Sequence, residues 1–144
     1  MERPIICVDF DGVIHSYDNG WQNGWQNGEI YGTVVPGFFE WAEEASVIFQ
    51  LTIFSSRSKN GVQREAMITW LWYRYLEYKG VSFEEGVSEE AKALIGVFGD
   101  LFVFSEEKPP AFISIDDRAI CFKGNWKAPE LTVPAMKDFR PWMV

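Results

Sequence analysis

One stretch decides the fold of this chain: Cys7-Val8-Asp9-Phe10-Asp11-Gly12-Val13-Ile14. It continues an apolar, β-branched run that begins at Ile5, and such a run predicts a short buried strand. Two carboxylates follow on alternate residues, so in extended backbone Asp9 and Asp11 project to the same side. Adjacent carboxylates repel each other, but they are the hard oxygen ligands that a divalent cation such as Mg²⁺ takes. Gly12 permits a sharp turn directly after the pair.

The Asp-x-Asp-Gly pattern has two other interpretations. Calcium-binding loops begin in the same way, but they need further acidic residues at alternate positions and a later Glu, which this segment does not supply. An acidic turn after a strand, with no chemical role, also fits the segment when it is taken alone. Segments further along the chain decide between a plain turn and a metal site.

The chain has 144 residues, of which 47% are hydrophobic and 17% aromatic, with a formal net charge of -8. This length and apolar content predict a single domain over residues 1–144 with a sizeable core. The negative charge argues against a membrane-surface binder and makes long nucleic acid an unexpected partner. No long apolar leader follows Met1, and no apolar run reaches the ~18 residues of a membrane span.

The cysteines and the single histidine limit the kinds of site. Cys7 and Cys121 lie in apolar runs, which predicts buried free thiols in a reducing compartment and hence a cytoplasmic protein. His15 is the only histidine, so a zinc site or a His-based triad is not expected. We expect His15 to be a residue of the neighbouring loop rather than a catalytic one.

Apolar periodicity and turn signals divide the rest of the chain into alternating helices and strands. Helices are expected over residues 38–45, 62–78 and 91–97, the last with Ser88 as its N-cap. Strands are expected over residues 47–54, 101–104 and 112–115, with a weaker candidate at 119–122. This alternation predicts an α/β fold, a Rossmann-like three-layer sandwich with a mainly parallel central sheet.

Two segments have no clear assignment. A polar, Gly-rich segment of about residues 15–33 contains the direct repeat Asn19-Gly20-Trp21-Gln22 and Asn23-Gly24-Trp25-Gln26, and each Asn-Gly predicts a turn. We interpret it as a hairpin or flap, whose tryptophans either cover a nearby site or anchor the flap on the surface. Residues of about 80–99 leave room for a small inserted element.

Polar clusters stand directly after the predicted strands. They are Asp9 and Asp11, then Ser55, Ser56 and Arg57, then Lys108, and finally Asp116 and Asp117. Open α/β sheets bind ligands at the carboxyl ends of their strands, so parallel strands would bring these clusters to one edge. Together they supply acids for a metal, hydroxyls for phosphate oxygens and a cation, which are the groups that phosphoryl transfer needs.

This arrangement resembles the haloacid dehalogenase (HAD) superfamily of aspartate-nucleophile phosphotransferases over about residues 4–122. The stretch from Asp9 to Val13 is similar to the first motif of that superfamily, Ser55 to the second, Lys108 to the third, and Asp116-Asp117 to the fourth. Each motif is degenerate alone, but all of them in order after strands are specific. The resemblance implies a HAD-like fold with a minimal cap, because the spacing of the motifs leaves no room for a large cap domain.

The resemblance also implies a role for each residue. Asp9 would be the nucleophile that forms an aspartyl-phosphate, and Asp11 the general acid and base, which requires a raised pKa at Asp11. Asp9, the backbone carbonyl of Asp11, and Asp116 would hold Mg²⁺, with Asp117 close by. The groups that bind the transferred phosphoryl group would be Ser55, the backbone of Ser56, and Lys108.

The implied function is that of a Mg²⁺-dependent phosphomonoester hydrolase. A cap-poor site would admit a small phosphorylated molecule or an accessible phosphate on a larger one. A catalytically idle phosphate-binding module on the same scaffold, and phosphoryl transfer to another acceptor, remain as alternatives; dehalogenation needs no metal and is disfavoured. Arg57 either binds substrate or pairs with an acid such as Asp117. Ser55 and Ser56 could also be a plain turn, and Lys108 a solvated loop residue.

Overall fold

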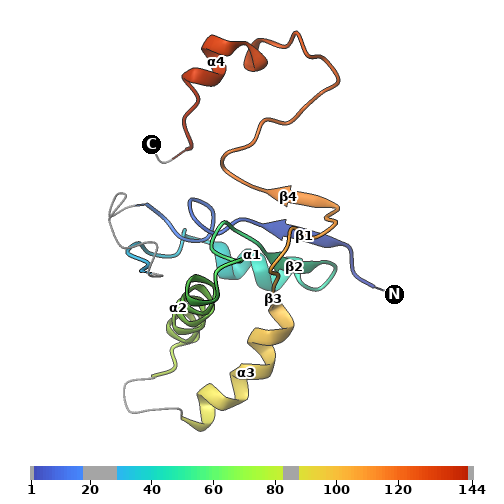
Figure 1. Cartoon of the computed structure of the whole chain (residues 1–144). Coiled ribbons are helices and arrows are strands. Elements are labelled where there is room, and N and C mark those ends of the chain that lie inside the picture. Colours follow the sequence, from blue (N-terminus) through green and yellow to red (C-terminus); the bar gives the residue numbers. More distant parts are fainter. Residues whose placement is uncertain (1, 18–28, 83–87, 143–144) are drawn as a thin grey trace.

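The computed structural model describes residues 2–17, 29–82 and 88–142 (Figure 1). Over these residues the chain has an α/β fold with a four-stranded parallel sheet in the order β3-β2-β1-β4, which confirms the predicted parallel sheet. The strands are β1 (Ile5–Val8), β2 (Gln50–Ile53), β3 (Phe102–Phe104) and β4 (Ile113–Ile115). The helices are α1 (Phe38–Ala45), α2 (Gly61–Lys79), α3 (Glu89–Leu101) and the short α4 (Val133–Lys137), which follows a 3-10 turn at Pro129–Leu131.

The order of the strands places the end of β1 at the point where the direction of winding reverses. β2 pairs with one edge of β1, and β3 continues outward from β2, whereas β4 returns to the other edge of β1. In open α/β sheets, ligands bind outside the carboxyl ends of the strands at this switch point. The chain therefore places Asp9, directly after β1, where such a site is expected.

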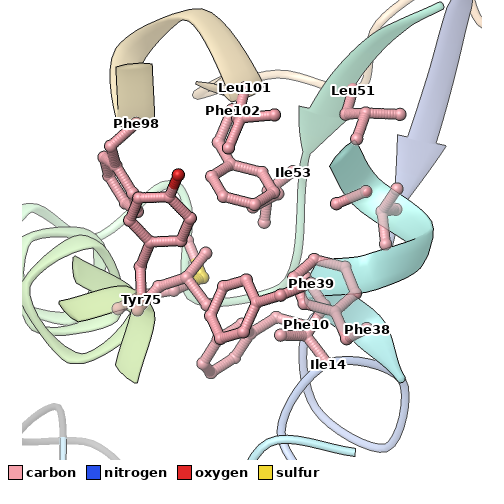
Figure 2. Close-up of a cluster of buried hydrophobic side chains, with 14 of the residues drawn as sticks. Phe10, Ile14, Phe38, Phe39, Leu51, Ile53, Tyr75, Phe98, Leu101 and Phe102 are labelled. Atoms are coloured by element: carbon pink, nitrogen blue, oxygen red, sulfur yellow. The ribbon is translucent and has the colours of Figure 1, made fainter. Parts of the chain in front are cut away.

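The core lies on one face of the sheet. Strand alternation puts Ile6, Val8, Leu51 and Ile53 on that face, and they belong to one buried cluster with residues of α1, α2 and α3 (Figure 2). The helical members of this cluster are Phe38, Phe39, Ala42, Met67, Leu71, Tyr75, Phe98 and Leu101. The core side chains of α1, α2 and α3 all pack on this one face of the sheet. A layer of helices on the opposite face, which the expected three-layer sandwich requires, therefore stays a prediction.

The helix ends follow their local sequence. The Asn60 side chain accepts hydrogen bonds from the backbone N–H groups of Val62 and Gln63 at 3.0 and 3.1 Å. At the other end of α2, Gly80 is the C-cap, with φ +72°. The predicted N-cap Ser88 accepts from the N–H of Ala91 at 3.1 Å. α3 then runs to Leu101 with its buried residues in the main core. α3 is therefore part of the core packing, and the small inserted element expected at about 80–99 stays a prediction, since residues 83–87 lie outside the described part.

Two expected strands differ from the structure. Val47 and Ile48 are 78% and 64% exposed and belong to the turn after α1, where the N–H groups of Ile48 and Phe49 bond to the carbonyl of Ala45. That turn shortens β2 to Gln50–Ile53. The candidate strand at 119–122 is wrong, because these residues are exposed coil. Cys7 is buried as predicted, whereas Cys121 is exposed.

The base of the expected flap is an antiparallel pairing of two short segments. The N–H of Ser16 donates to the carbonyl of Thr33, and the N–H of Val35 donates to that of Ile14, both at 2.8 Å. The Asn-Gly-Trp-Gln repeat lies outside the described residues. This pairing brings residues 29–35 next to the turn that follows β1.

The chain beyond β4 follows a separate path from the sheet (Figure 1). Several large side chains of this segment are exposed, including Trp126 at 79% and Trp142 at 61%. Its far end returns to the turn after β1, because Trp142 Nε1 donates to the backbone carbonyl of Gly12 at 2.5 Å. None of the described helices has the length and apolar composition needed to cross a membrane.

Candidate active site

The turn after β1 is built around Phe10. Its side chain is fully buried, and its carbonyl accepts hydrogen bonds from the N–H groups of Val13, Ile14 and His15. The N–H of Asp9 donates to the carbonyl of Ile115 at 3.0 Å, which ties this residue to the end of β4. Since Phe10 points into the core, its two carboxylate neighbours face away from the core, toward the carboxyl edge of the sheet.

Gly12 allows the turn to touch the end of β4. Its φ is +85°, and a Cβ on this residue would lie 2.2 Å from Asp117 Oδ2. The left-handed backbone and the lack of space both require glycine at this position. Gly12 thus allows the Asp117 carboxylate to lie next to the turn that carries Asp9 and Asp11.

One pocket collects most of the predicted site residues. It has a volume of about 180 Å³, and its lining includes Asp9, Ser55, Ser56, Lys108 and Asp116. These residues follow different strands, so the parallel sheet brings them together as expected. The pocket therefore combines two carboxylates, hydroxyl groups and an ammonium group in one small space.

Three carboxylates in this region could hold a cation. Oxygens of Asp9, Asp116 and Asp117 all lie within 4.8 Å of one another. Both oxygens of Asp117 are buried, and neither has a hydrogen-bond partner among the described residues. Buried carboxylate oxygens without partners are costly, and a divalent cation would offset that cost. The donor set fits a hard cation such as Mg²⁺, with Asp117 as a full member of the cluster.

The pKa values of these carboxyl groups follow from their crowding. Burial raises the pKa of Asp9 to about 7, and the negative charges of Asp116, Asp117 and Asp11 add to this effect, although a hydrogen bond from the backbone opposes it. Burial also raises the pKa of Asp117, an effect that the nearby Arg118 partly opposes. The cluster thus carries more negative charge than its surroundings neutralise.

Asp11 has the opposite environment. Arg57 Nε donates to Asp11 Oδ2 at 2.8 Å, and Arg57 Nη2 donates to Asp11 Oδ1 at 3.2 Å. Burial acts to raise the pKa of Asp11, but hydrogen bonds from His15 and Arg57 outweigh it and hold the pKa below its usual value. The expected rise at Asp11 is therefore wrong, because His15 and Arg57 both donate to its carboxylate. Arg57 pairs with an acid, as one of its two expected roles had it, but that acid is Asp11.

His15 contributes directly to the environment of Asp11. His15 is buried, with 4% of the residue exposed, and its Nδ1 lies 2.8 Å from Asp11 Oδ1. The N–H of Gly32 donates to His15 Nε2 at 2.8 Å, so the ring proton belongs on Nδ1, from which it is donated to Asp11. His15 also bridges to Val34 at the base of the flap, as expected for a residue of that loop. Its contact with Asp11 was not expected, and it forms because the turn at Gly12 folds the chain back within four residues. That glycine was the signal available in the sequence.

The loop after β2 is a tight turn in which the hydroxyl of Ser55 accepts a hydrogen bond from the backbone of the same turn. The N–H of Arg57 donates to Ser55 Oγ, and the N–H of Ser55 donates to Ser58 Oγ, both at 3.0 Å. The turn therefore orients Arg57 toward Asp11 while its residues Ser55 and Ser56 line the pocket. The exposed Lys108 lines the same pocket from the loop after β3.

A second pocket of about 180 Å³ adjoins the first. Its lining consists of Asp9, Asp11, Tyr17, Ser56 and Arg118. Sequence reasoning did not select Tyr17 or Arg118. The position of Arg118 directly after Asp116-Asp117, at the end of a predicted strand, was the signal that pointed to it.

Comparison of the chain with family models, with curated proteins and with solved structures finds no match in any of the three. The functional interpretation therefore depends on the motifs and on the geometry of the two pockets.

Proposed function

We propose that this chain is a Mg²⁺-dependent phosphomonoester hydrolase of the HAD type. One observation carries this proposal: Asp9, Ser55, Ser56, Lys108 and Asp116 line the same pocket. The substrate would be a small phosphorylated molecule or an accessible phosphate on a larger one. We likewise propose a single HAD-like domain with a minimal cap, in keeping with the parallel sheet and with the core helix α3 at a place where a cap could have been inserted. We also propose a cytoplasmic location.

Asp9, Asp116 and Asp117 would hold the Mg²⁺ ion, with the backbone carbonyl of Asp11 as the further ligand that the motif implies. Bound Mg²⁺ would neutralise charge on the phosphate and on the carboxylates around it. Lys108, together with the hydroxyl and backbone groups of Ser55 and Ser56, would bind the oxygens of the transferred phosphoryl group.

In the first step, a carboxylate oxygen of Asp9 bonds to phosphorus while the bond from phosphorus to the ester oxygen breaks, and Asp11 gives a proton to that oxygen. In the second step, water attacks the aspartyl-phosphate, Asp11 takes a proton from the water, and inorganic phosphate leaves. The ionised Asp11 beside Arg57 is in the form that the second step needs. Substrate binding must weaken this pairing before Asp11 can carry the proton for the first step.

The test is replacement of the nucleophile. Asp9→Asn keeps the shape of the side chain but removes its nucleophilic oxygen, and phosphate release from phenyl phosphate with Mg²⁺ should fall by about 10³-fold or more. Asp100→Asn, at an exposed acid on α3, is the control that removes the same charge elsewhere and should retain activity. Equal rates for Asp9→Asn and the wild type would rule the proposal out.

A phosphate-binding module without catalysis is the second candidate. The observation that favours it is the pairing of Asp11 with both Arg57 and His15, which holds the carboxylate in a form that cannot donate a proton. A panel of phosphomonoesters measured with and without Mg²⁺ separates the candidates. Saturable, Mg²⁺-dependent turnover supports the hydrolase, whereas saturable binding without turnover supports the module.

A further inference from the structure

Two pockets share Asp9 and Ser56 but differ in their cations. Lys108 lines one of them, while Tyr17, Arg118 and Asp11 line the other. We propose that the pocket with Arg118 binds the leaving group of the substrate, and that Arg118 recognises an anionic group on it. The preferred substrates would then be phosphomonoesters whose alcohol carries a second anionic group, a carboxylate or a phosphate. This inference rests on the proposed function and extends it to the class of substrate.

The position of Asp11 assigns the leaving group to this pocket. A general acid must lie within hydrogen-bond reach of the oxygen that it protonates. Asp11 lines the pocket with Arg118 and is not among the residues that line the pocket with Lys108. If the phosphoryl group occupies the pocket with Lys108, its ester oxygen must face Asp11, and the rest of the alcohol extends toward Tyr17 and Arg118.

Arg118 lines this pocket and has the chemistry of an anion-binding residue. Its backbone N–H donates to Asp116 Oδ1 at 2.8 Å, which fixes the residue directly after the carboxylate cluster. Its side chain forms no salt bridge with any residue that the structure describes, whereas the guanidinium of Arg57 is paired with Asp11. A guanidinium group presents paired N–H donors that match a carboxylate or a phosphate.

Near Arg118 lies the carboxylate of Asp117, which belongs to the carboxylate cluster. The charge of Arg118 partly opposes the rise that burial causes in the pKa of Asp117, so the two groups are near each other. Asp117 also belongs to the carboxylate cluster with Asp9 and Asp116, and a cation held there would satisfy it. Arg118 is then the cation that remains for a ligand in this pocket.

Tyr17 forms a wall of the same pocket. A Cβ on Gly12 would lie 3.0 Å from Tyr17 Cε2, so the tyrosine ring lies close to the turn after β1. Burial raises the pKa of Tyr17 to about 12, and the phenol therefore stays protonated near neutral pH. A neutral aromatic wall beside a guanidinium suits an organic anion better than it suits a second metal ion.

The test uses substrates that differ only in the second anionic group. The two pairs are 2-phosphoglycolate with 2-hydroxyethyl phosphate, and 4-carboxyphenyl phosphate with phenyl phosphate. For at least one pair the wild type should prefer the carboxylated member by about tenfold or more in kcat/KM. Arg118→Met should reduce that ratio toward one, chiefly by lowering kcat/KM for the carboxylated substrate. Lys123→Met removes an exposed cation five residues further along the chain and should leave the ratio unchanged.

Dissociation constants of the same ligands provide a readout that needs no turnover. They are measured calorimetrically with Mg²⁺ on Asp9→Asn, with and without Arg118→Met. If the wild type proves inactive, the proposed function fails, but a preference for carboxylated ligands that depends on Arg118 still supports this inference. If neither the turnover of the wild type nor the binding to Asp9→Asn prefers the carboxylated ligands, the inference is overturned. It is also overturned by an Arg118→Met variant that loses both members of a pair equally, because Arg118 would then act on the phosphoryl group.

Discussion

Asp11 lies between two partners that reach it from different parts of the chain. Arg57 comes from the loop after β2, and His15 from the turn after β1. The N–H of Gly32 donates to Nε2 of His15, so the ring proton lies on Nδ1 and is donated to Asp11. His15 therefore acts as a positioning residue that holds the Asp11 carboxylate in place.

Changes at His15 should act on turnover more than on substrate binding. His15→Leu removes the donor to Asp11, and we expect kcat to fall about 10- to 100-fold with little change in KM. His15→Asn places an amide N–H near the position of Nδ1 and should retain more of kcat, although both variants lose the acceptor for Gly32. Steady-state kinetics and thermal unfolding of both variants provide the measurement. Equal losses of kcat at equal stability would mean that the donor to Asp11 has no role.

Gly12→Ala should disturb the carboxylate cluster. The substitution places a Cβ 2.2 Å from Asp117 Oδ2 in backbone with φ +85°, so Asp117 must move, and the strain is about 1–2 kcal/mol. We expect weaker binding of Mg²⁺ and a lower free energy of unfolding, measured by Mg²⁺ titration and denaturant unfolding. Gly61→Ala is the matched control, because nothing lies within 4 Å of its added Cβ. A Gly12→Ala variant with the Mg²⁺ affinity of the control would contradict the close contact.

The raised pKa of Asp9 predicts how stability depends on pH when no metal is bound. The folded-state pKa is about 7 against an ordinary value of 3.8, so between these values the unfolded state has released a proton that the folded state keeps. The stability contribution of Asp9 is therefore complete below about pH 4 and is lost as the pH rises to about 7. The raised pKa of Asp117 acts in the same direction.

Asp9→Asn removes this loss of stability. In the presence of a chelator, we expect the melting temperature of Asp9→Asn to exceed that of the wild type at pH 7.5, and the difference to shrink at pH 5. Thermal unfolding at both pH values measures it, with Asp100→Asn as the control for the loss of one charge. A wild type whose stability relative to Asp9→Asn did not change between pH 5 and pH 7.5 would contradict the crowding of Asp9.

Among the elements, α2 connects the loop of the site to the core. It begins after the turn that orients Arg57, and its residues Met67, Leu71 and Tyr75 belong to the core cluster. Asn60→Ala removes the acceptor for two backbone N–H groups and should cost about 1 kcal/mol in the free energy of unfolding. Asn60→Asp keeps a side-chain acceptor and should keep most of that stability, as measured by denaturant unfolding. Equal losses in the two variants would exclude the cap as the cause.

The elements were predictable where local signals agreed with packing. α1 has the predicted bounds, and the N-cap Ser88 correctly marks the start of α3. The predicted strand β2 was too long. Val47 and Ile48 continue the apolar run of that strand in the sequence, but in the structure they lie in the exposed turn after α1. Apolar character alone could not distinguish an exposed helix end from a buried strand. The same limit explains the wrong prediction at 119–122.

At the scale of the whole molecule, the sequence could predict which groups meet but not how they pair. The expected parallel strands, with a polar cluster after each, were enough to predict that Asp9, Ser55, Lys108 and Asp116 meet. The partner of Asp11 was not predictable, because Arg57 lies 46 residues away and could have served several acids. Such pairings depend on side-chain directions that only the folded chain fixes.

A cation held by the carboxylate cluster would link metal binding to the stability of the whole fold. Asp9 and the Asp116-Asp117 pair follow neighbouring strands of the sheet, so their geometry exists only when β1 and β4 are paired. A cation that binds the folded state and not the unfolded one stabilises it by about 2.7 kcal/mol at a hundredfold excess over Kd. We therefore expect Mg²⁺ to raise the melting temperature by several degrees relative to a chelator.

The variants Asp116→Asn and Asp117→Asn should lose most of this Mg²⁺-dependent rise, because each removes one anionic donor from the cluster. Asp100→Asn should keep it, since that acid is exposed on α3. Thermal unfolding over a series of Mg²⁺ concentrations measures the effect for all of them. If Asp117→Asn showed the same rise as the wild type, the ion would not depend on the two buried oxygens of Asp117, and the cluster would not be its site.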